Sequence, residues 1–397
     1  MPVTGESMKR RDFLAASAAL ALLSSSPAHA AKKTAHKKPT PKKPAKKPAE
    51  QTDTAREPES RAAVSLPEEP PAQWKTYDIV STLSLTEPTG KTRLWLPLPR
   101  YKDTPWERSL GHRWQGNFAT AGIYRDPVAE MEVFYADWPE GIDHPTLQIA
   151  SQIATQDRHF DITQRQPVAE RTEVLRRCLR STELLSGDGM VRRTAERAVG
   201  RIKNPLAQGK AIYDWVVENT AYDPALNNAV ERPISEMLET GNLTGRSADI
   251  ALLFVGLCRA VGIPARPVFG LRVDSSRLFD SLGVVGELSE AQHCRAEFYT
   301  PGYGWIPVDP ADVRKAIREE RLNDSDSKLP VLKKLLFGFW EMNWIGFNAA
   351  QDVGLQGSTG ALLPYLNTPV IETREGRFDS RNKDRVRYSV TANRVET

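Results

Sequence analysis

The chain of 397 residues has only three cysteines and six histidines. Three cysteines close at most one disulfide bridge, which excludes a disulfide-built framework. The sequence has no CxxC pair, no HExxH motif and no Cys/His cluster, so a zinc site is not expected. It also lacks GxxxxGK[ST] and a strand–helix GxGxxG, the common signals for nucleotide binding. We therefore expect no metal and no organic cofactor.

Positive charge is concentrated near the N-terminus. The whole chain carries a net charge of +4. Residues 31–73 hold eight Lys and two Arg against six acidic residues, and residues 1–30 carry +1, so the remaining chain carries −1. A chain without a basic field over its folded part is not expected to bind nucleic acid.

Residues 1–30 have the pattern of an export signal. Lys9-Arg10-Arg11-Asp12-Phe13-Leu14 resembles a twin-arginine motif, and the apolar stretch that follows, to about Leu23, is too short for a permanent membrane span. Ala28-His29-Ala30 is a small-x-small cleavage site. A buried N-terminal helix is the alternative. We expect an exported, periplasmic protein with no stable membrane insertion after cleavage of the signal.

Residues 31–73 alternate Lys pairs with Pro and Ala. Like charges repel and Pro favours extended geometry, so the pattern predicts a disordered linker. The alternative is adhesion of this segment to anionic cell-envelope polymers.

The rest of the chain divides by its hydrophobic period. Residues 74–160 show short alternating runs, which predict a small antiparallel β-sandwich-like domain. Helical periodicity begins at about Pro167, and residues 161–325 are predicted to form an α+β core in which a buried helix packs on an antiparallel sheet. Residues 326–397 are predicted to form a C-terminal extension that packs on this core. Five of its aromatic residues either line a cleft or pack in the core of the extension, and core packing is the favoured interpretation: Phe337, Phe339, Trp340, Trp344 and Phe347.

The segment from Gly241 to Pro264 predicts the buried helix. A Gly-bearing loop enters a helix that starts near Ser247 and is apolar nearly all round. Gly262 fits the position after the helix, and Pro264 stops it.

Residues 292–310 predict a β-hairpin. In Gln292–Tyr299, Cys294 lies on the apolar face and His293 on the polar face. A turn at residues 301–304 leads to a return strand that ends at Asp309, so we expect Asp309 opposite His293 or one diagonal away.

Together these pieces resemble the bacterial transglutaminase-like family. The resemblance rests on Val261-Gly262-Ile263-Pro264-Ala265-Arg266 and Gly304-Trp305-Ile306-Pro307-Val308-Asp309-Pro310 and covers roughly residues 200–320. It implies a papain-like fold and a Cys-His-Asp triad that makes or breaks amide bonds. His293 then has the role of the acid–base residue, and Asp309 orients its imidazole.

The chain departs from the family at the nucleophile, because Ser247 stands where the family carries Cys. Cys258 lies 11 residues further along the helix, about 16 Å away at 1.5 Å per residue. Cys294 faces the core, and no motif surrounds Cys178. Ser247 is therefore a helix-capping remnant in a site without thiol chemistry, the nucleophile of a Ser-His-Asp triad, or an engineered or misaligned position.

Two functions follow from these alternatives. One is an amide hydrolase or acyltransferase acting on peptide or isopeptide groups of a peptide or protein substrate. The other is a non-catalytic scaffold, a pseudoenzyme, that keeps the cleft and binds peptide or cell-envelope material. Arg246, just before Ser247, either meets an acidic substrate group or is solvated.

Overall fold

Two antiparallel sheets form the β-rich part of the chain. The computed structural model describes residues 73–100, 102–127, 129–165, 169–226 and 231–395. The sheets contain β1 (Lys75–Leu85), β2 (Thr92–Leu98), β3 (Glu107–Gly116), β4 (Thr120–Asp126), β5 (Met131–Trp138), β6 (Thr146–Thr155), β15 (Val370–Thr373), β16 (Gly376–Asp379) and β17 (Val386–Val395). One has the strand order β17-β1-β6-β3 and the other β16-β15-β2-β5-β4. Apolar residues of both sheets, such as Leu83, Leu96 and Trp138, share one core, as expected for a sandwich.

A third antiparallel sheet carries the residues of the predicted hairpin. Its strands are β10 (Ala265–Arg272), β11 (Gln292–Thr300), β12 (Gly304–Val308) and β14 (Trp344–Asn348), in the order β12-β11-β10-β14. Two further pairs are short: antiparallel β7 (Arg158–His159) with β13 (Phe339–Trp340), and parallel β8 (Ala221–Tyr222) with β9 (Thr244–Gly245).

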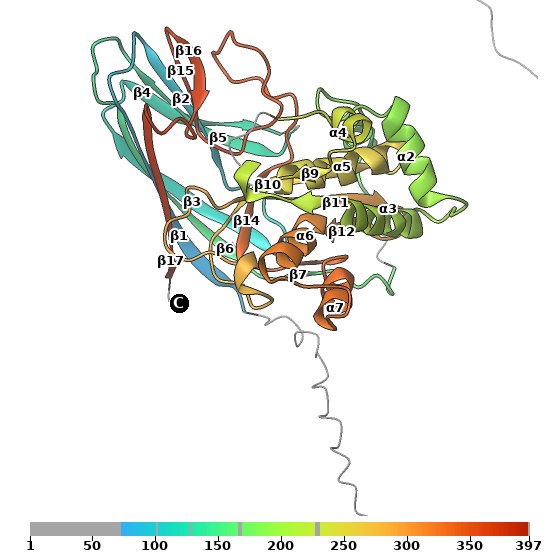
Figure 1. The fold of residues 1–397 in the computed structure, drawn as a ribbon. Coiled ribbons are helices and arrows are strands. Elements are labelled where there is room, and N and C mark those ends of the chain that lie inside the picture. Colours follow the sequence, from blue (N-terminus) through green and yellow to red (C-terminus); the bar gives the residue numbers. More distant parts are fainter. Residues whose placement is uncertain (1–72, 101, 128, 166–168, 227–230, 396–397) are drawn as a thin grey trace, which may run out of the picture. The chain divides into compact units, whose positions relative to one another are not determined.

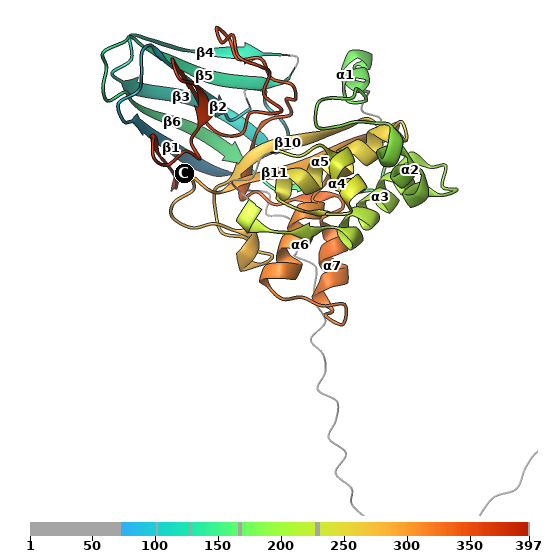
Figure 2. The same cartoon turned by 45° about the horizontal axis from the view of Figure 1, so that its top comes forward.

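Helix α5 (Ser247–Ala260) packs directly on β10 and β11. The other helices are α1 (Thr172–Arg177), α2 (Gly189–Val199), α3 (Pro205–Asn219), α4 (Ile234–Thr240), α6 (Pro310–Glu319) and α7 (Lys328–Leu335), with 3₁₀ turns η1 (Pro224–Leu226) and η2 (Asp280–Leu282). Helices α2, α3, α4 and α6 contact α5, and Figures 1 and 2 show the helices gathered on the side of β10 and β11 away from the sandwich. Within the described ranges, no helix combines the length and the apolar character that crossing a membrane requires.

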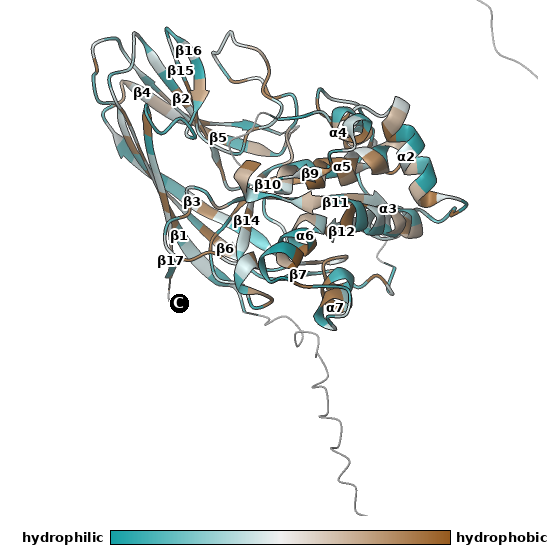
Figure 3. Ribbon diagram, viewed as in Figure 1, coloured by the Kyte–Doolittle hydropathy of each residue, from teal (hydrophilic) through white to brown (hydrophobic). Residues whose placement is uncertain are grey.

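The sequence of α5 explains its central position. Every residue from Ala248 to Ala260 is buried, and Figure 3 shows mostly apolar colours along this helix. Gly262 has φ +84°, a left-handed conformation that glycine adopts without strain. The amide of Ile263 donates to the carbonyl of Cys258 at 2.9 Å, which closes the helix as the Gly262-Ile263-Pro264 pattern predicts.

The predicted fold class is confirmed: a buried helix packs on an antiparallel sheet, with a sandwich before it in the sequence. The chain after residue 326 does more than pack on the core, as the predicted extension would. Its strand β14 pairs with β10, whereas β15 and β17 pair with β2 and β1 of the sandwich. The predicted signal (1–30) and nearly all of the predicted linker (31–73) lie outside the described residues.

Candidate functional site

The β11–β12 hairpin brings His293 and Asp309 together. Its register places Ala296 opposite Val308, so Asp309 follows the end of β12 one diagonal from His293. His293 Nε2 lies 2.8 Å from Asp309 Oδ2. Asp309 also begins α6, where its Oδ1 accepts a hydrogen bond from the Asp312 amide at 2.9 Å. The carboxylate is thereby fixed by a helix start, and a proton on Nε2 leaves Nδ1 as the accepting atom of the ring.

Ser247 lies beside this pair, at the first position of α5. Its Oγ accepts a hydrogen bond from the backbone amide of Cys294 at 3.3 Å, so the hydroxyl reaches β11 at the residue after His293. Ser247 and His293 line the same cavity, which has a volume of about 230 Å³. The first backbone N–H groups of a helix have no partner within the helix, so the start of α5 offers donors to an anion formed in this cavity.

Four buried charges surround the imidazole of His293. Asp312 Oδ1 lies 3.4 Å from His293 Nε2 and accepts a hydrogen bond from Arg272, and Arg295 Nε lies 3.2 Å from Asp309 Oδ2. Burial lowers the pKa of His293 and Arg272 lowers it further, although the two carboxylates oppose this. Burial and Arg272 therefore favour the neutral form of the imidazole.

The two arginines also balance the negative charge of the two carboxylates. Burial alone would raise the pKa of Asp312, but Arg272, His293 and Arg295 together lower it. Among the described residues, His293, Asp309 and Asp312 form the one group whose ligand atoms lie close enough to hold a metal ion, within 4.8 Å of one another. Because each carboxylate already faces a guanidinium, this group does not need a cation to balance its charge.

Comparison with known proteins identifies the family. The model of the transglutaminase-like superfamily matches residues 192–310, the part of the chain that contains Ser247, His293 and Asp309. An uncharacterized protein of Haemophilus influenzae is 32% identical over 299 residues, which cover 70% of this chain and 80% of the relative. The chain belongs to the transglutaminase-like superfamily. Membership supports a transglutaminase-like function in the broad sense.

One solved structure agrees with this fold. A proposed cysteine protease of Cytophaga hutchinsonii has a TM-score of 0.51 at 16% identity, over 82% of this chain and 92% of that one. At this identity the likeness shows the fold alone. The periplasmic domain of TgpA from Pseudomonas aeruginosa has a TM-score of 0.33 at 14% identity, over 60% of this chain and 93% of that domain.

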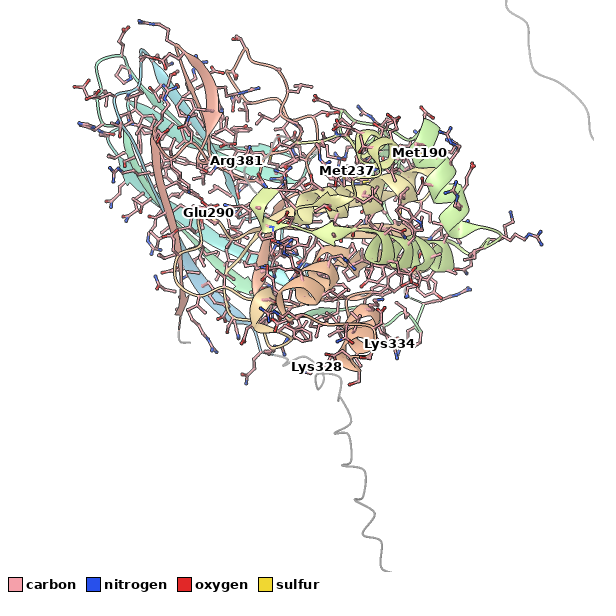
Figure 4. All side chains as sticks on the ribbon, in the orientation of Figure 1. Met190, Met237, Glu290, Lys328, Lys334 and Arg381 are labelled. Atoms are coloured by element: carbon pink, nitrogen blue, oxygen red, sulfur yellow. The ribbon has the colours of Figure 1, made fainter. Side chains whose placement is uncertain are left out.

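The cavity of this transglutaminase-like protein is built from distant parts of the sequence. Besides Ser247 and His293 it is lined by Tyr222, Arg246, Ala248, Arg272, Gly283, Val284, Glu287, Ser289, Glu290, Ala291, Gln292, Lys315, Tyr365, Asn367, Thr368, Ser380, Arg381 and Lys383. Figure 4 labels two of these, Glu290 and Arg381. The residues from Tyr365 onward had no sequence signal, because they lie in the irregular segments before β15 and after β16, where the chain returns to the sandwich.

The three cysteines take no part in the cavity. Cys178, Cys258 and Cys294 are all buried and unpaired as disulfides, and burial raises the pKa of each thiol. Cys258 and Cys294 belong to the main apolar core, as their positions on the helix and on the strand predict. A buried thiol with a raised pKa is a poor nucleophile.

Two other sequence expectations are resolved by the contacts. Arg246 is not solvated, because only 8% of the residue is exposed, and it lines the cavity with its Nε donating to Asp249 Oδ2 at 3.0 Å. The five C-terminal aromatic residues are buried in three apolar clusters and do not line the cavity. Sequence reasoning gave no site role to Arg272, Arg295 or Asp312. The available signals were the alternation that puts Arg295 on the polar face with His293 and the helix-start spacing of Asp309 and Asp312.

Proposed function

We propose that this protein is a serine-dependent hydrolase or acyltransferase acting on peptide or isopeptide amides. The observation that carries the proposal is the arrangement around His293. Its Nε2 is held by Asp309, and its ring lines the same cavity as the hydroxyl of Ser247. The residue types and their order match the nucleophile, base and orienting acid of a triad.

The neutral imidazole explains how serine fits a site of this family. A thiol site works through a thiolate–imidazolium ion pair, which needs a charged ring. A serine site needs a neutral ring at the moment of attack, because the base takes the hydroxyl proton during that step. Burial and Arg272 lower the pKa of His293 and so favour the neutral form.

The proposed reaction has two steps. The Ser247 Oγ–H proton passes to His293 Nδ1 while Oγ attacks the carbonyl carbon, and backbone N–H groups at the start of α5 stabilise the oxyanion. His293 then gives the proton to the leaving amine, which leaves an ester on Ser247. In the second step, water or a second amine gives a proton to His293 and attacks the ester carbonyl. The bond to Ser247 Oγ then breaks, His293 returns the proton to Oγ, and an acid or a new amide is released.

A non-catalytic role is the second candidate. The hydroxyl of Ser247 already accepts a hydrogen bond from the Cys294 amide of β11, which gives it a structural role; it does not cap α5, whose N-cap residue is Arg246. A protein with this arrangement can retain a peptide-binding cleft without forming an ester.

The test compares the mature protein with its Ser247→Ala, Ser247→Cys and His293→Ala variants. Each is incubated with an activated acyl ester and with a panel of peptides and isopeptides, and intact mass and product release are recorded. We expect a single acyl adduct on the wild type that is lost in Ser247→Ala and His293→Ala. Since the native cysteines are buried, a thiol reagent should label native Ser247→Cys once and the wild type not at all.

The outcomes separate the two candidates. An adduct that forms only on Ser247→Cys means that the cleft is intact and the native chain has lost the chemistry, which supports the scaffold. An adduct that persists in Ser247→Ala overturns the assignment of the nucleophile.

We also propose export to the periplasm, supported by Arg10-Arg11 and by Ala28-His29-Ala30 in the sequence. N-terminal sequencing of the secreted form should find Ala31. Material that keeps Met1 after expression in a host with twin-arginine export would contradict this. Binding of the Lys/Pro segment to anionic envelope polymers remains a proposal, to be tested by co-sedimentation of the protein with and without residues 31–73.

A further inference from the structure

Lys315 is a cation of the cavity that lacks a close counter-charge. It lies on α6 with its side chain 18% exposed, and its Nζ lies 5.9 Å from the centre of the Tyr222 ring, another residue of the cavity wall. Its one ion pair within the described part of the chain joins Nζ to Glu319 Oε2 at 4.0 Å. That distance is the limit of an ion pair and too long for a hydrogen bond.

The other four cations of the cavity wall are each paired at close range. Their carboxylate partners are Asp249 for Arg246 at 3.0 Å, Asp312 for Arg272, Asp379 for Arg381 at 2.6 Å and Glu290 for Lys383 at 2.5 Å. The two acidic residues of the cavity wall also have close partners. Glu290 binds Lys383, and Glu287 accepts hydrogen bonds from the backbone amides of Ser289 and Val390.

The cavity wall therefore carries five cations and two carboxylates. Of the five cations, Lys315 has the most distant counter-charge. A partly buried ammonium whose one ion pair is as long as 4.0 Å is unfavourable, since burial removes water and no hydrogen bond to a carboxylate replaces it. Burial lowers the pKa of Lys315 and the positive charge of Arg272 lowers it further, and the carboxylates of Asp312, Glu319 and Asp309 only partly oppose this. A ligand that brings an anion to Nζ would remove this penalty.

We infer that Lys315 binds a carboxylate of the substrate, so that the preferred substrates are peptides with an acidic group next to the scissile amide. The inference rests on the proposed function, since it takes the cavity beside Ser247 as the place where the amide binds. The cavity is small, and a ligand group seated in it lies near both Ser247 and Lys315. Tyr222 adds an aromatic surface over which the side chain of Lys315 is held.

The size of the expected effect follows from the bond type. A hydrogen bond to a charged group contributes about 1.5–3 kcal/mol, which corresponds to a ~10- to 100-fold change in kcat/KM. Because the carboxylate is bound before and during the reaction, the change should appear mainly in KM.

The experiment uses two peptides that differ only by Glu or Gln next to the cleaved amide. The wild type should prefer the Glu peptide, Lys315→Met should lose this preference, and Lys315→Arg should keep part of it. The ratio of kcat/KM for the Glu peptide to kcat/KM for the Gln peptide is the readout. Lys210→Met is the matched control, because Lys210 pairs with Asp214 on α3 and does not line the cavity. Thermal unfolding of each variant verifies that it is folded.

Binding of both peptides to Ser247→Ala, with and without Lys315→Met, is measured in parallel. Equal turnover of the Glu and Gln peptides by the wild type overturns the inference and leaves the proposed function standing. Tight binding of the Glu peptide that depends on Lys315, without turnover, overturns the proposed function and supports the carboxylate site. Absence of both turnover and binding overturns both.

Discussion

At the residue scale, the imidazole of His293 lies among buried charges of both signs. Two carboxylates, Asp309 and Asp312, and two guanidiniums, Arg272 and Arg295, are buried around one imidazole. A neighbouring carboxylate favours the imidazolium, whereas burial and a neighbouring guanidinium favour the neutral ring. The arginines neutralise the acids, so burial and Arg272 determine the state of the ring. A site arranged in this way suits an uncharged nucleophile, the role that the proposed function gives to the hydroxyl of Ser247.

The first prediction concerns the pH dependence of the reaction. Only the neutral ring accepts the proton of Ser247, and the pKa of His293 is lowered, so kcat/KM should fall with acid only below about pH 6.5, the ordinary range of histidine. Arg272→Gln removes a positive charge near the ring and should move this midpoint upward. Arg272→Lys keeps the charge and is the control. A midpoint of the wild type above the ordinary range would contradict the neutral-base mechanism.

At the scale of elements, the central helix and the hairpin were predictable because their signals are local. The apolar run that ends at Gly262 predicts α5, and the alternation around His293 predicts β11 and the faces of its side chains. Asp309 was expected opposite His293 or one diagonal away, and the diagonal arrangement is the one found. The spacing of a tight hairpin leaves few other registers.

Pairings between distant segments were not predictable in the same way. Strand β17 pairs with β1 along ten residues, although about 300 residues separate them. Nothing in a single strand specifies its partner, because only the packed core selects it. The same reason hides Tyr365 and Arg381 from sequence reasoning, since they reach the cavity through this return of the chain.

The second prediction concerns the packing of α5. A Cβ added at Gly256 would lie 2.0 Å from Ile234 Cδ1 of α4, so Gly256→Ala should destabilise the fold by about 1–3 kcal/mol. Gly187→Ala is the control, because its Cβ would meet only Ser181 Oγ at 3.7 Å, an ordinary contact. Urea unfolding of both variants measures the difference. Equal midpoints would show that α4 moves aside without cost.

At the scale of the whole described chain, buried charges link the sandwich to the third sheet. Glu107 of β3 accepts a hydrogen bond from the Gly346 amide of β14 at 2.8 Å. Glu297 of β11 accepts hydrogen bonds from Arg158 of β7 at 2.5 Å and from Arg266 of β10 at 2.6 Å. Burial raises the pKa of Glu107 to about 7 despite the opposing charge of Arg100. Burial would do the same at Glu297, but Arg266 and Arg158 lower its pKa to about 2.

Because the two pKa shifts have opposite directions, the two carboxyl groups stabilise the fold in opposite pH ranges. The folded pKa of Glu107 lies above its unfolded value of 4.5, so its contribution is fully present below pH 4.5 and is lost as the pH rises through 7. The folded pKa of Glu297 lies below 4.5, so its contribution is present above that pH and is lost as the pH falls toward 2. Each shift corresponds to about 3 kcal/mol.

The last prediction follows from this contrast. Glu107→Gln keeps an acceptor for the Gly346 amide and removes the buried carboxylate, so the variant should be more stable than the wild type by about 1–3 kcal/mol at pH 8 and nearly equal to it at pH 5. Glu297→Gln leaves Arg158 and Arg266 without their shared anion, and it should lose about 3–5 kcal/mol at pH 8. Urea unfolding at both pH values measures the two differences. If Glu107→Gln is destabilised at pH 8, the carboxylate is ionised and paired in the folded protein, and the link between β3 and β14 is then an ion pair through Arg100 instead of a neutral hydrogen bond.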